Sequence, residues 1–320
     1  MPGLGEHYDG ASPILQFATC LRKSNLFATM PAHLLWFIIL GCFWGLTPSF
    51  YKLMGEAGLP ITHIIVYTGL IVGVALAIVP AIKGRFIITR QILFYGLGCA
   101  ALLNIPFAMS LFFSRHVAPT EYALIVSTAP FWNYILALVT RRESVSRHRL
   151  GALLVGFLSS AVLIVSRGGE AESGISLWVI AAFAVPIVYS LYNWFAGAYW
   201  PKNADILMVG AAESVFSGLL AIPFMLVLAP PWGDATPPLF AYWTAAAAAL
   251  LWIVERIAFF TLIREKGAVY TIQAIYVSTP AAVLWAIFIF GRPADPWIWV
   301  SLAILMLALW LNNRKQRVAL

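Results

Sequence analysis

Residues 122–134 read YALIVSTAPFWNY, and residues 271–283 read TIQAIYVSTPAAV. In each stretch a Val-Ser-Thr run precedes a proline within an apolar segment that is too long for a β-strand. The triplets are 151 residues apart, whereas Pro130 and Pro280 are 150 residues apart, so both features cannot be aligned without a gap. We align the prolines, because a proline removes a backbone hydrogen bond and kinks its helix. What recurs is therefore a helix break beside polar side chains.

The composition of the whole chain indicates that most of it lies in lipid and not in water. Of 320 residues, 62% are hydrophobic and only 10% are charged, and the mean hydropathy is +0.87. A soluble domain carries about 25% charged residues. These values predict an all-α polytopic membrane protein. The net charge of +7 does not indicate nucleic-acid binding, because the basic residues lie in short loops.

Ten apolar segments are long enough for a transmembrane helix, which needs roughly 20 residues. Two neighbouring pairs are divided only by SRHVAPT and by REKG, but each pair would be too long for a single crossing. The ten predicted spans are 32–53, 62–82, 92–114, 118–139, 149–166, 177–199, 205–229, 239–263, 267–290 and 296–312. With the N-terminus in the cytoplasm, 15 of the 20 Lys and Arg residues face the cytoplasm. The positive-inside rule therefore predicts that both termini are cytoplasmic.

The prolines also predict an internal duplication. Pro48 corresponds to Pro186 and Pro130 to Pro280, while the separation grows smoothly from 138 to 150 residues. The predicted units are an N-terminal tail at 1–31, a five-helix repeat at 32–166, a second repeat at 167–312, and a basic tail at 313–320. Because five is odd, the second repeat must enter the membrane from the opposite side. Inverted repeats of this kind are typical of secondary transporters, whose substrate site lies near the midplane.

Ten helices in a five-plus-five inverted repeat resemble the EamA-type branch of the drug/metabolite transporter superfamily. The resemblance covers residues 32–312. CFWGLTPSFYKL (42–53), with its Trp44-Gly45 pair, is similar to the first helix of that branch. TEYALIVSTAPFWNYILALVTRRE (120–143), with Pro130 and Glu143, is similar to the fourth. The chain departs from the pattern at Pro293, where a second acidic residue is expected, and at Tyr67, in a region that often carries Arg.

The resemblance implies an exporter in a bacterial inner membrane. The predicted function is a secondary transporter that exports small amphipathic metabolites by alternating access around a central cavity. Neutral amino acids with bulky or aromatic side chains are the first expectation, and other metabolites or drugs are the alternative. The expected partners are this solute and the lipid bilayer, without nucleic acid or ATP. We expect a monomer that is not an enzyme and needs no cofactor or metal.

Three ionisable residues, Glu213, Glu255 and Arg256, lie within predicted spans. Each is about eight residues, or roughly 12 Å, from the predicted cytoplasmic end of its helix. An unpaired charge at that depth is costly, so such residues mark a pathway and have a partner. Arg256 is predicted to pair with Glu213 or Glu255, and the interhelical pair with Glu213 is the simpler geometry. This pair either fixes two helices together or forms a gate or a site for the charged ends of the solute.

Uncharged polar and aromatic side chains at mid-span depth are candidates for a substrate cavity, since a zwitterion needs a few polar contacts and an aromatic wall. The same amides also serve as hydrogen-bonding links between helices, and both roles stay open. A face of small residues that includes Gly151 and Gly156 predicts close helix packing. The cavity candidates are Trp44, Tyr51, Tyr67, Asn104, Asn133, Tyr189, Asn193, Trp194, Trp252, Gln273 and Tyr276.

Prolines inside the spans are candidate helix breaks or hinges. Each frees a carbonyl group that needs a partner or a water-lined cavity within the membrane. Static bending of the helix is the alternative. The five candidates are Pro48, Pro106, Pro130, Pro186 and Pro280.

Motifs for other function classes are absent from the sequence. It contains no GxxxxGK[ST] loop for ATP and no HExxH, CxxC or GxSxG motif. An integral-membrane enzyme that modifies lipids is the competing class, and it needs His, Asp or Glu side chains that converge at one membrane face. The sequence offers only loose clusters of this kind, such as Glu143 with His148.

Overall fold

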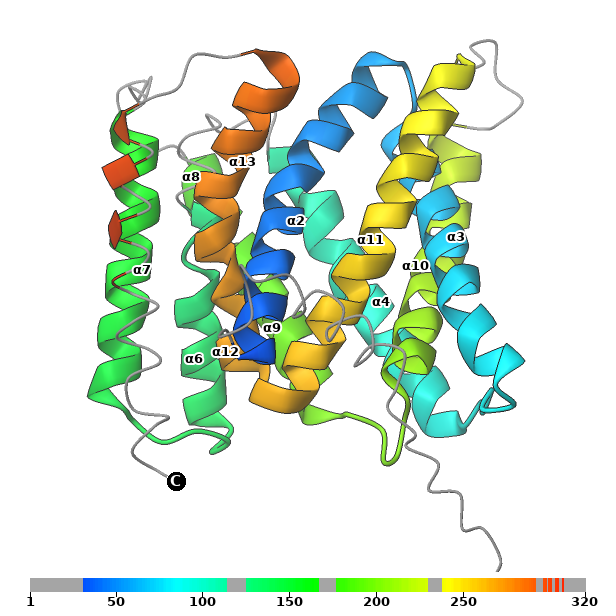
Figure 1. Cartoon of the computed structure of the whole chain (residues 1–320), viewed down its shortest axis with the longest axis horizontal. Helices are drawn as coiled ribbons and strands as arrows, with labels where there is room; N and C mark the ends of the chain where they lie inside the picture. The colour runs from blue at the N-terminus through cyan, green and yellow to red at the C-terminus, as the bar shows by residue number, and fades with distance from the viewer. Residues whose placement is uncertain are drawn as a thin grey trace, which may run out of the picture.

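The computed structural model describes residues 31–113, 125–166, 177–229 and 238–291, together with 296–297, 299–300, 303–304 and 307. The described part of the chain forms a bundle of roughly parallel and antiparallel helices (Figure 1). The helices are α2 Ala32–Glu56, α3 Ile61–Ile82, α4 Arg90–Phe113, α6 Ala129–Val139, α7 Arg147–Ser166, α8 Leu177–Ala182, α9 Ala184–Ala198, α10 Ile206–Leu228, α11 Leu239–Lys266, α12 Ala268–Ile272 and α13 Ala274–Phe290.

Seven helical segments of the described residues are long and apolar enough to cross a membrane. Large apolar side chains such as Val74, Leu154, Val227 and Phe288 are exposed on the outside of the bundle, as expected of a surface that faces lipid. The prediction of a polytopic, all-α membrane protein is therefore confirmed. The spans predicted at 118–139 and 296–312 lie partly outside the described residues.

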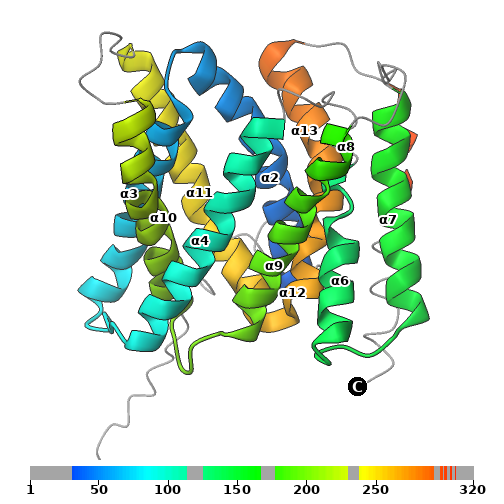
Figure 2. The same ribbon diagram turned by 180° about the vertical axis from the view of Figure 1, so that it is seen from behind.

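The helices are arranged in two layers. Figure 1 shows α13, α2 and α11 side by side, and Figure 2, seen from behind, shows α6, α9 and α4. The helices α3 and α10 pack against each other at one edge of the bundle, and α7 lies at the other edge, next to α13. The helix contacts connect the layers, since α9 of the second layer packs against α11 of the first.

Basic residues gather at one end of the bundle, which we call the basic end. The helix termini and loops at this end are those at the bottom of Figure 1. Of the other basic residues in the described ranges, Lys52 lies near the opposite end and Arg256 lies between the two ends. The basic end carries Lys83, Arg85, Arg90, Arg141, Arg142, Arg147, Arg149, Lys202, Arg264 and Lys266.

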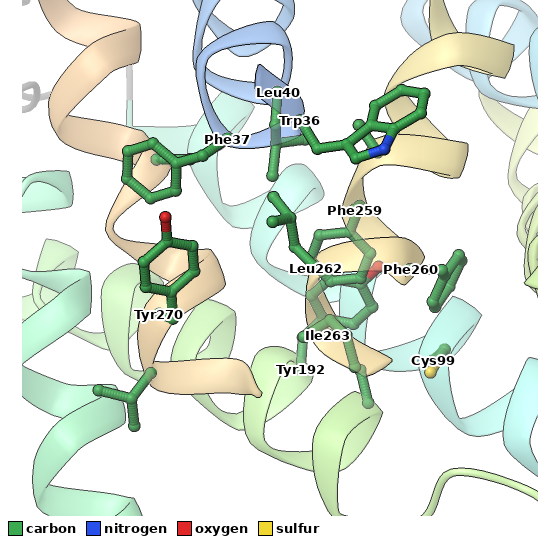
Figure 3. Close-up of a cluster of buried hydrophobic side chains, with 14 of the residues drawn as sticks. Trp36, Phe37, Leu40, Cys99, Tyr192, Phe259, Phe260, Leu262, Ile263 and Tyr270 are labelled. Carbon is green, nitrogen blue, oxygen red and sulfur yellow. The ribbon is translucent and has the colours of Figure 1, made fainter. Parts of the chain in front are cut away.

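The hydrophobic core is continuous at the basic end and divided at the opposite end. One large cluster joins side chains from α2, α4, α6, α7, α9, α10, α11, α12 and α13, and Figure 3 shows its aromatic centre. Near the opposite end, one cluster around Met54 joins α2, α3 and α11, whereas another around Phe113 joins α4, α8 and α9. The packing therefore seals the basic end across all of these helices.

Three of the predicted spans are interrupted within the described residues. Ser127 and Thr128 form a turn before α6, Phe183 separates α8 from α9, and Gln273 separates α12 from α13. The predicted division between 239–263 and 267–290 is present at Gly267, which ends α11 with a φ of 80°. That left-handed backbone is strained for other residues, and it allows the chain to reverse tightly into α12.

The prolines relate to these interruptions in different ways. Pro130 and Pro186 lie in the first turns of α6 and α9, where the missing N–H group costs no helical hydrogen bond. Pro48 and Pro106 lie inside the uninterrupted helices α2 and α4. The break predicted near Pro280 falls instead at Gln273, and Pro280 lies inside α13.

The two side chains before Pro280 bond to the backbone of α13. Ser278 and Thr279 both donate hydrogen bonds to the carbonyl oxygen of Ile275, at 2.8 and 3.3 Å. Pro280 has no N–H group to donate to the carbonyl of Tyr276, four residues earlier, and α13 continues through it as a helix with that hydrogen bond missing. The role of all five prolines as hinges stays a prediction.

Candidate functional site

Five polar side chains meet inside the bundle and form what we call the central cluster: Trp44, Tyr192, Glu213, Glu255 and Arg256. They come from four helices, α2, α9, α10 and α11. Glu213 lies seven residues from the start of α10, so it is roughly 10 Å from the basic end of that helix. Two carboxylates and a guanidinium thus lie well inside a membrane-spanning bundle.

An ion pair between Glu213 and Arg256 links α10 to α11. The Nη1 atom of Arg256 lies 2.9 Å from Oε1 and 3.2 Å from Oε2 of Glu213. The Glu213 side chain is 1% exposed. This is the interhelical pair that the sequence favours as the simpler geometry.

Arg256 also contacts Glu255, its neighbour in α11. Its Nη2 atom lies 3.2 and 3.3 Å from the two carboxylate oxygens of Glu255. The sequence left two partners open for Arg256, and the guanidinium serves both because its nitrogens form a planar fork. The indole N–H of Trp44 donates a 2.7 Å hydrogen bond to Oε1 of Glu255, so this carboxylate also joins α11 to α2.

Tyr192 completes the cluster from α9. Its hydroxyl donates a 2.8 Å hydrogen bond to Glu213 and accepts one of 3.0 Å from Arg256. Its ring stacks on Phe259, with ring centroids 5.3 Å apart and planes 9° apart. The Arg256 guanidinium lies 5.8 Å from the same Phe259 ring. The cluster therefore rests on the aromatic core that seals the basic end.

Removing the Tyr192 hydroxyl tests whether the cluster is a connected network. Tyr192→Phe keeps the ring that stacks on Phe259 but removes both hydrogen bonds. We expect the free energy of unfolding to fall by about 1–3 kcal/mol, because a buried charged group loses a partner. Thermal unfolding of the purified variant in detergent measures this, with Tyr242→Phe as a control on a partly exposed ring near the opposite end. Equal losses in both variants would contradict the network.

A second polar link lies one helical turn from Glu213. Ser217 donates a 2.6 Å hydrogen bond to the side-chain oxygen of Asn104, whose amide nitrogen donates a 3.0 Å bond to the Ser217 carbonyl. Trp252 donates a 3.3 Å hydrogen bond to Thr47 across the same pair of helices that Trp44 and Glu255 join. Asn104 and Trp252 are thus near the central cluster, and their side chains serve as links between helices.

Two further amides bind backbone carbonyl groups of α9. Asn133 donates to the carbonyl of Ser190 at 3.0 Å, and Asn193 donates to that of Tyr189 at 3.0 Å. Both amides are buried, and neither side-chain oxygen has a hydrogen-bond partner. Tyr189 itself is half-buried and interacts with Ser110 of α4.

Several predicted cavity residues are not brought to the central cluster. Tyr67 packs on His63 and Tyr242 near the opposite end. Trp194 donates to Thr140 near the basic end, and Tyr276 donates to the carbonyl of Leu153 on α7. These residues were chosen because they lie at similar depths along their predicted spans. Depth alone does not indicate which side of a helix a residue occupies.

Gln273 and Tyr51 are the remaining candidates for the substrate cavity. Gln273 is buried at the interruption between α12 and α13. The side chain of Tyr51 lies outside the described residues.

Tyr192 is the member of the cluster that the sequence reasoning missed. It follows Tyr189 by three residues and precedes the buried Ala196 by four, so the helical period places all three on one face of α9. That periodicity was a usable signal. Among the described residues, no group of three or more His, Cys, Asp or Glu side chains is placed to hold a metal ion.

Comparison with known proteins identifies the fold. No protein-family profile matches the sequence, and no curated protein matches it significantly. Among solved structures, 27 chains match. One, described only as a crystal structure of a protein, has a TM-score of 0.70 and 14% sequence identity, and the match covers 88% of this chain and 98% of that one. At this identity the likeness establishes a shared fold and nothing further.

Proposed function

We propose that this protein is a secondary transporter that exports small amphipathic metabolites, with neutral amino acids as the first substrate class. The observation that carries the proposal is the central cluster, in which Glu213, Glu255 and Arg256 lie inside a bundle of membrane-spanning helices. Charged groups at such a depth are costly, and they are typical of substrate and ion pathways. The resemblance to the EamA-type branch of the drug/metabolite transporter superfamily points the same way.

The helix contacts support ten spans in an inverted repeat. Under the proposed repeat, α2 corresponds to α9, α3 to α10, α4 to α11, and α6 to α13. The helix α2 packs against α11 and α13, and its counterpart α9 packs against α4 and α6, the counterparts of those two. Likewise α3 packs against α11, whereas α10 packs against α4. Each of these contacts thus has an equivalent in the other half, as a pseudo-twofold axis requires.

The packing supports a conformation that is closed at the basic end. Helices of both layers share one hydrophobic cluster at the basic end, whereas the clusters near the opposite end are separate. Arg256 points toward α9 and α10, yet its side chain keeps 15% exposure. A solute that enters from the opposite end would meet the central cluster as the floor of its site.

The cluster has the chemistry to bind a zwitterion. Its carboxylates attract an ammonium group, and the Arg256 guanidinium attracts a carboxylate, because both are charge-assisted hydrogen bonds. Trp44, Tyr189 and Tyr192 supply aromatic walls for an apolar side chain. Alternating access then requires α2 to part from α11, which breaks the Trp44–Glu255 hydrogen bond and opens the basic end.

The proposed orientation places the basic end in the cytoplasm of a bacterial cell, by the positive-inside rule. The driving force is a solute or ion gradient across the inner membrane, and both proposed repeats belong to one chain, in agreement with a monomer. Efflux from proteoliposomes loaded with a panel of labelled neutral amino acids tests the proposal. Absence of efflux for every member of the panel, by protein that is folded, would overturn it.

Glu213→Gln tests the role of the ion pair in transport. The variant keeps one carboxylate, Glu255, for Arg256, so we expect it to stay folded. We expect transport to be abolished, because the link between α10 and α11 and the binding charge are both lost. Efflux of the same labelled amino acids from proteoliposomes measures transport, and gel filtration monitors folding. Glu56→Gln, an exposed carboxylate paired with Lys52, is the control. Transport by Glu213→Gln at the rate of the control would contradict this role.

A further inference from the structure

A groove runs between α6 and α9 on the outer surface of the bundle. These two helices pack against each other, and Figure 2 shows them side by side on the face turned toward the viewer. The groove has a volume of about 200 Å³. Its walls include Ile135 and Val139 of α6 and Ile187 of α9, whose side chains are all exposed. The groove therefore opens outward, where lipid surrounds a membrane-spanning bundle.

The walls of this groove offer hydrocarbon and no free polar group. Trp132 and Ser190 are the two lining residues whose side chains can form hydrogen bonds, and both have partners. The indole N–H of Trp132 donates to the hydroxyl of Thr128 at 3.2 Å. The Ser190 hydroxyl lies 2.7 and 2.6 Å from the carbonyl oxygens of Ala129 and Pro186. A polar occupant would lose its hydrogen bonds to water without replacement, so the groove suits an apolar chain.

Two arginine side chains lie where the groove reaches the basic end. Arg141 and Arg142 follow α6 directly, within three residues of the lining residue Val139, and both are exposed. Arg142 reaches across to α9, where its Nη2 atom donates a 3.3 Å hydrogen bond to the carbonyl oxygen of Ala198. Its guanidinium lies 5.9 Å from the ring of Trp194. The groove thus has hydrocarbon along its length and positive charge at one end.

The surrounding acidic groups leave this positive charge largely uncompensated. Glu143, which follows the two arginines, forms an ion pair with Arg149 instead. Among the described residues, the basic end carries ten Lys and Arg side chains and three acidic ones, Glu143, Asp205 and Glu265. A surface with this excess of basic groups attracts anions.

The backbone at Arg141 is a second unusual feature of this end of the groove. Arg141 has a φ of 55°, in the left-handed region. The N–H groups of Arg141 and Arg142 donate to the carbonyl oxygens of Leu138 and Ala137, which is the turn that usually ends a helix with Gly or Asn. A residue with a Cβ atom is strained in this conformation. An arginine therefore stands here at a cost to stability, as residues with a functional role often do.

We propose that the groove binds an acyl chain of an anionic phospholipid whose phosphate group contacts Arg141 and Arg142. Guanidinium groups donate charge-assisted hydrogen bonds to phosphate, and basic pockets between helices on the cytoplasmic side bind anionic headgroups. From Val139 to Trp132 the groove extends roughly 10 Å along α6 toward the middle of the bundle. The acyl chain therefore enters in the direction that lipids of the adjoining leaflet take. This site lies on the outer surface and does not depend on the proposed transport.

Native mass spectrometry of the purified full chain in detergent tests the headgroup contact. The probes are phosphatidylglycerol, which is anionic, and phosphatidylcholine, which has no net charge. We expect wild type to bind phosphatidylglycerol in preference. The double variant Arg141→Gln, Arg142→Gln should bind it about thirtyfold more weakly, because each basic residue near an anionic lipid surface contributes about fivefold. Arg85→Gln, at an exposed arginine of the same end outside the groove, is the control and should bind as wild type does. Equal binding of both lipids by wild type, or unchanged binding by the double variant, overturns the site.

A variant that fills the groove tests the acyl-chain contact without changing any charge. Ile187→Trp places a larger ring in the groove and should weaken phosphatidylglycerol binding. Ile180→Trp makes the same change at an exposed position on α8 outside the groove and should bind as wild type does. Equal binding by these two variants overturns the acyl-chain site. A wild-type dimer in gel filtration that Ile187→Trp converts to a monomer would assign the groove to a second copy of the chain, which also overturns the proposal.

Discussion

Arg256→Met should be among the most destabilising single substitutions in this protein. The change removes the only cation that the central cluster contains and leaves Glu213 and Glu255 buried beside each other. Removing one partner of a buried ion pair costs about 3–5 kcal/mol, because the remaining charge has no compensation. We expect a fall in the free energy of unfolding of this size. Thermal unfolding in detergent, followed by the loss of the monomer peak in gel filtration, measures it.

Two further variants separate charge from packing. Arg264→Met makes the same change of side chain on the same helix at an exposed position, so it should unfold at the wild-type temperature. The triple variant Glu213→Gln, Glu255→Gln, Arg256→Met removes all three charges and should recover much of the lost stability. A buried ion cluster is often replaced by neutral groups at little cost. A triple variant that is less stable than Arg256→Met would show that lost packing, not unpaired charge, dominates.

The sequence predicted the parts of the fold that depend on composition and length. Apolar segments of about 20 residues have one stable structure in lipid, the helix, because every backbone polar group must be paired. The breaks after REKG and before Pro130 were also predictable, since Gly267 and Pro130 impose their own backbone geometry. The break at Gln273 was not predictable from the proline rule.

The central cluster was predicted in part. The cost of charge in a membrane identified Glu213, Glu255 and Arg256, and that rule needs no knowledge of helix packing. The contact with Trp44 was not predictable, because it depends on how α2 is rotated about its axis against α11. Tyr276 and Trp194 were placed in the cavity by depth alone, and the structure turns them toward other partners. The depth of a residue in the membrane follows from its position along the span. The rotation of a helix about its axis depends instead on how it packs against all neighbouring helices.

Gly45→Val is the second substitution with a large expected effect. A Cβ atom at this position would lie 2.6 Å from the carbonyl oxygen of Ser278 and 2.7 Å from the backbone nitrogen of Ala282. These are backbone atoms of α13, so relief requires the whole helix to move away from α2. Small residues at such crossings let two helices approach closely. Overpacking costs about 1–3 kcal/mol when side chains yield, and we expect a loss at or above that range here.

Gly151→Val is the matched control, because no described residue lies within 4 Å of the Cβ position at Gly151. Gly156 on the same helix packs against Tyr276, as the face of small residues predicts, whereas Gly151 makes no such contact with the described residues. We expect Gly151→Val to unfold at the wild-type temperature in detergent and Gly45→Val to unfold well below it. Equal unfolding temperatures for the two variants would contradict the close crossing of α2 and α13. Gly45 also adjoins Trp44, so a shift of α2 withdraws the indole from Glu255. The milder Gly45→Ala places only the Cβ atom against α13, so its unfolding temperature should lie between those of Gly45→Val and wild type.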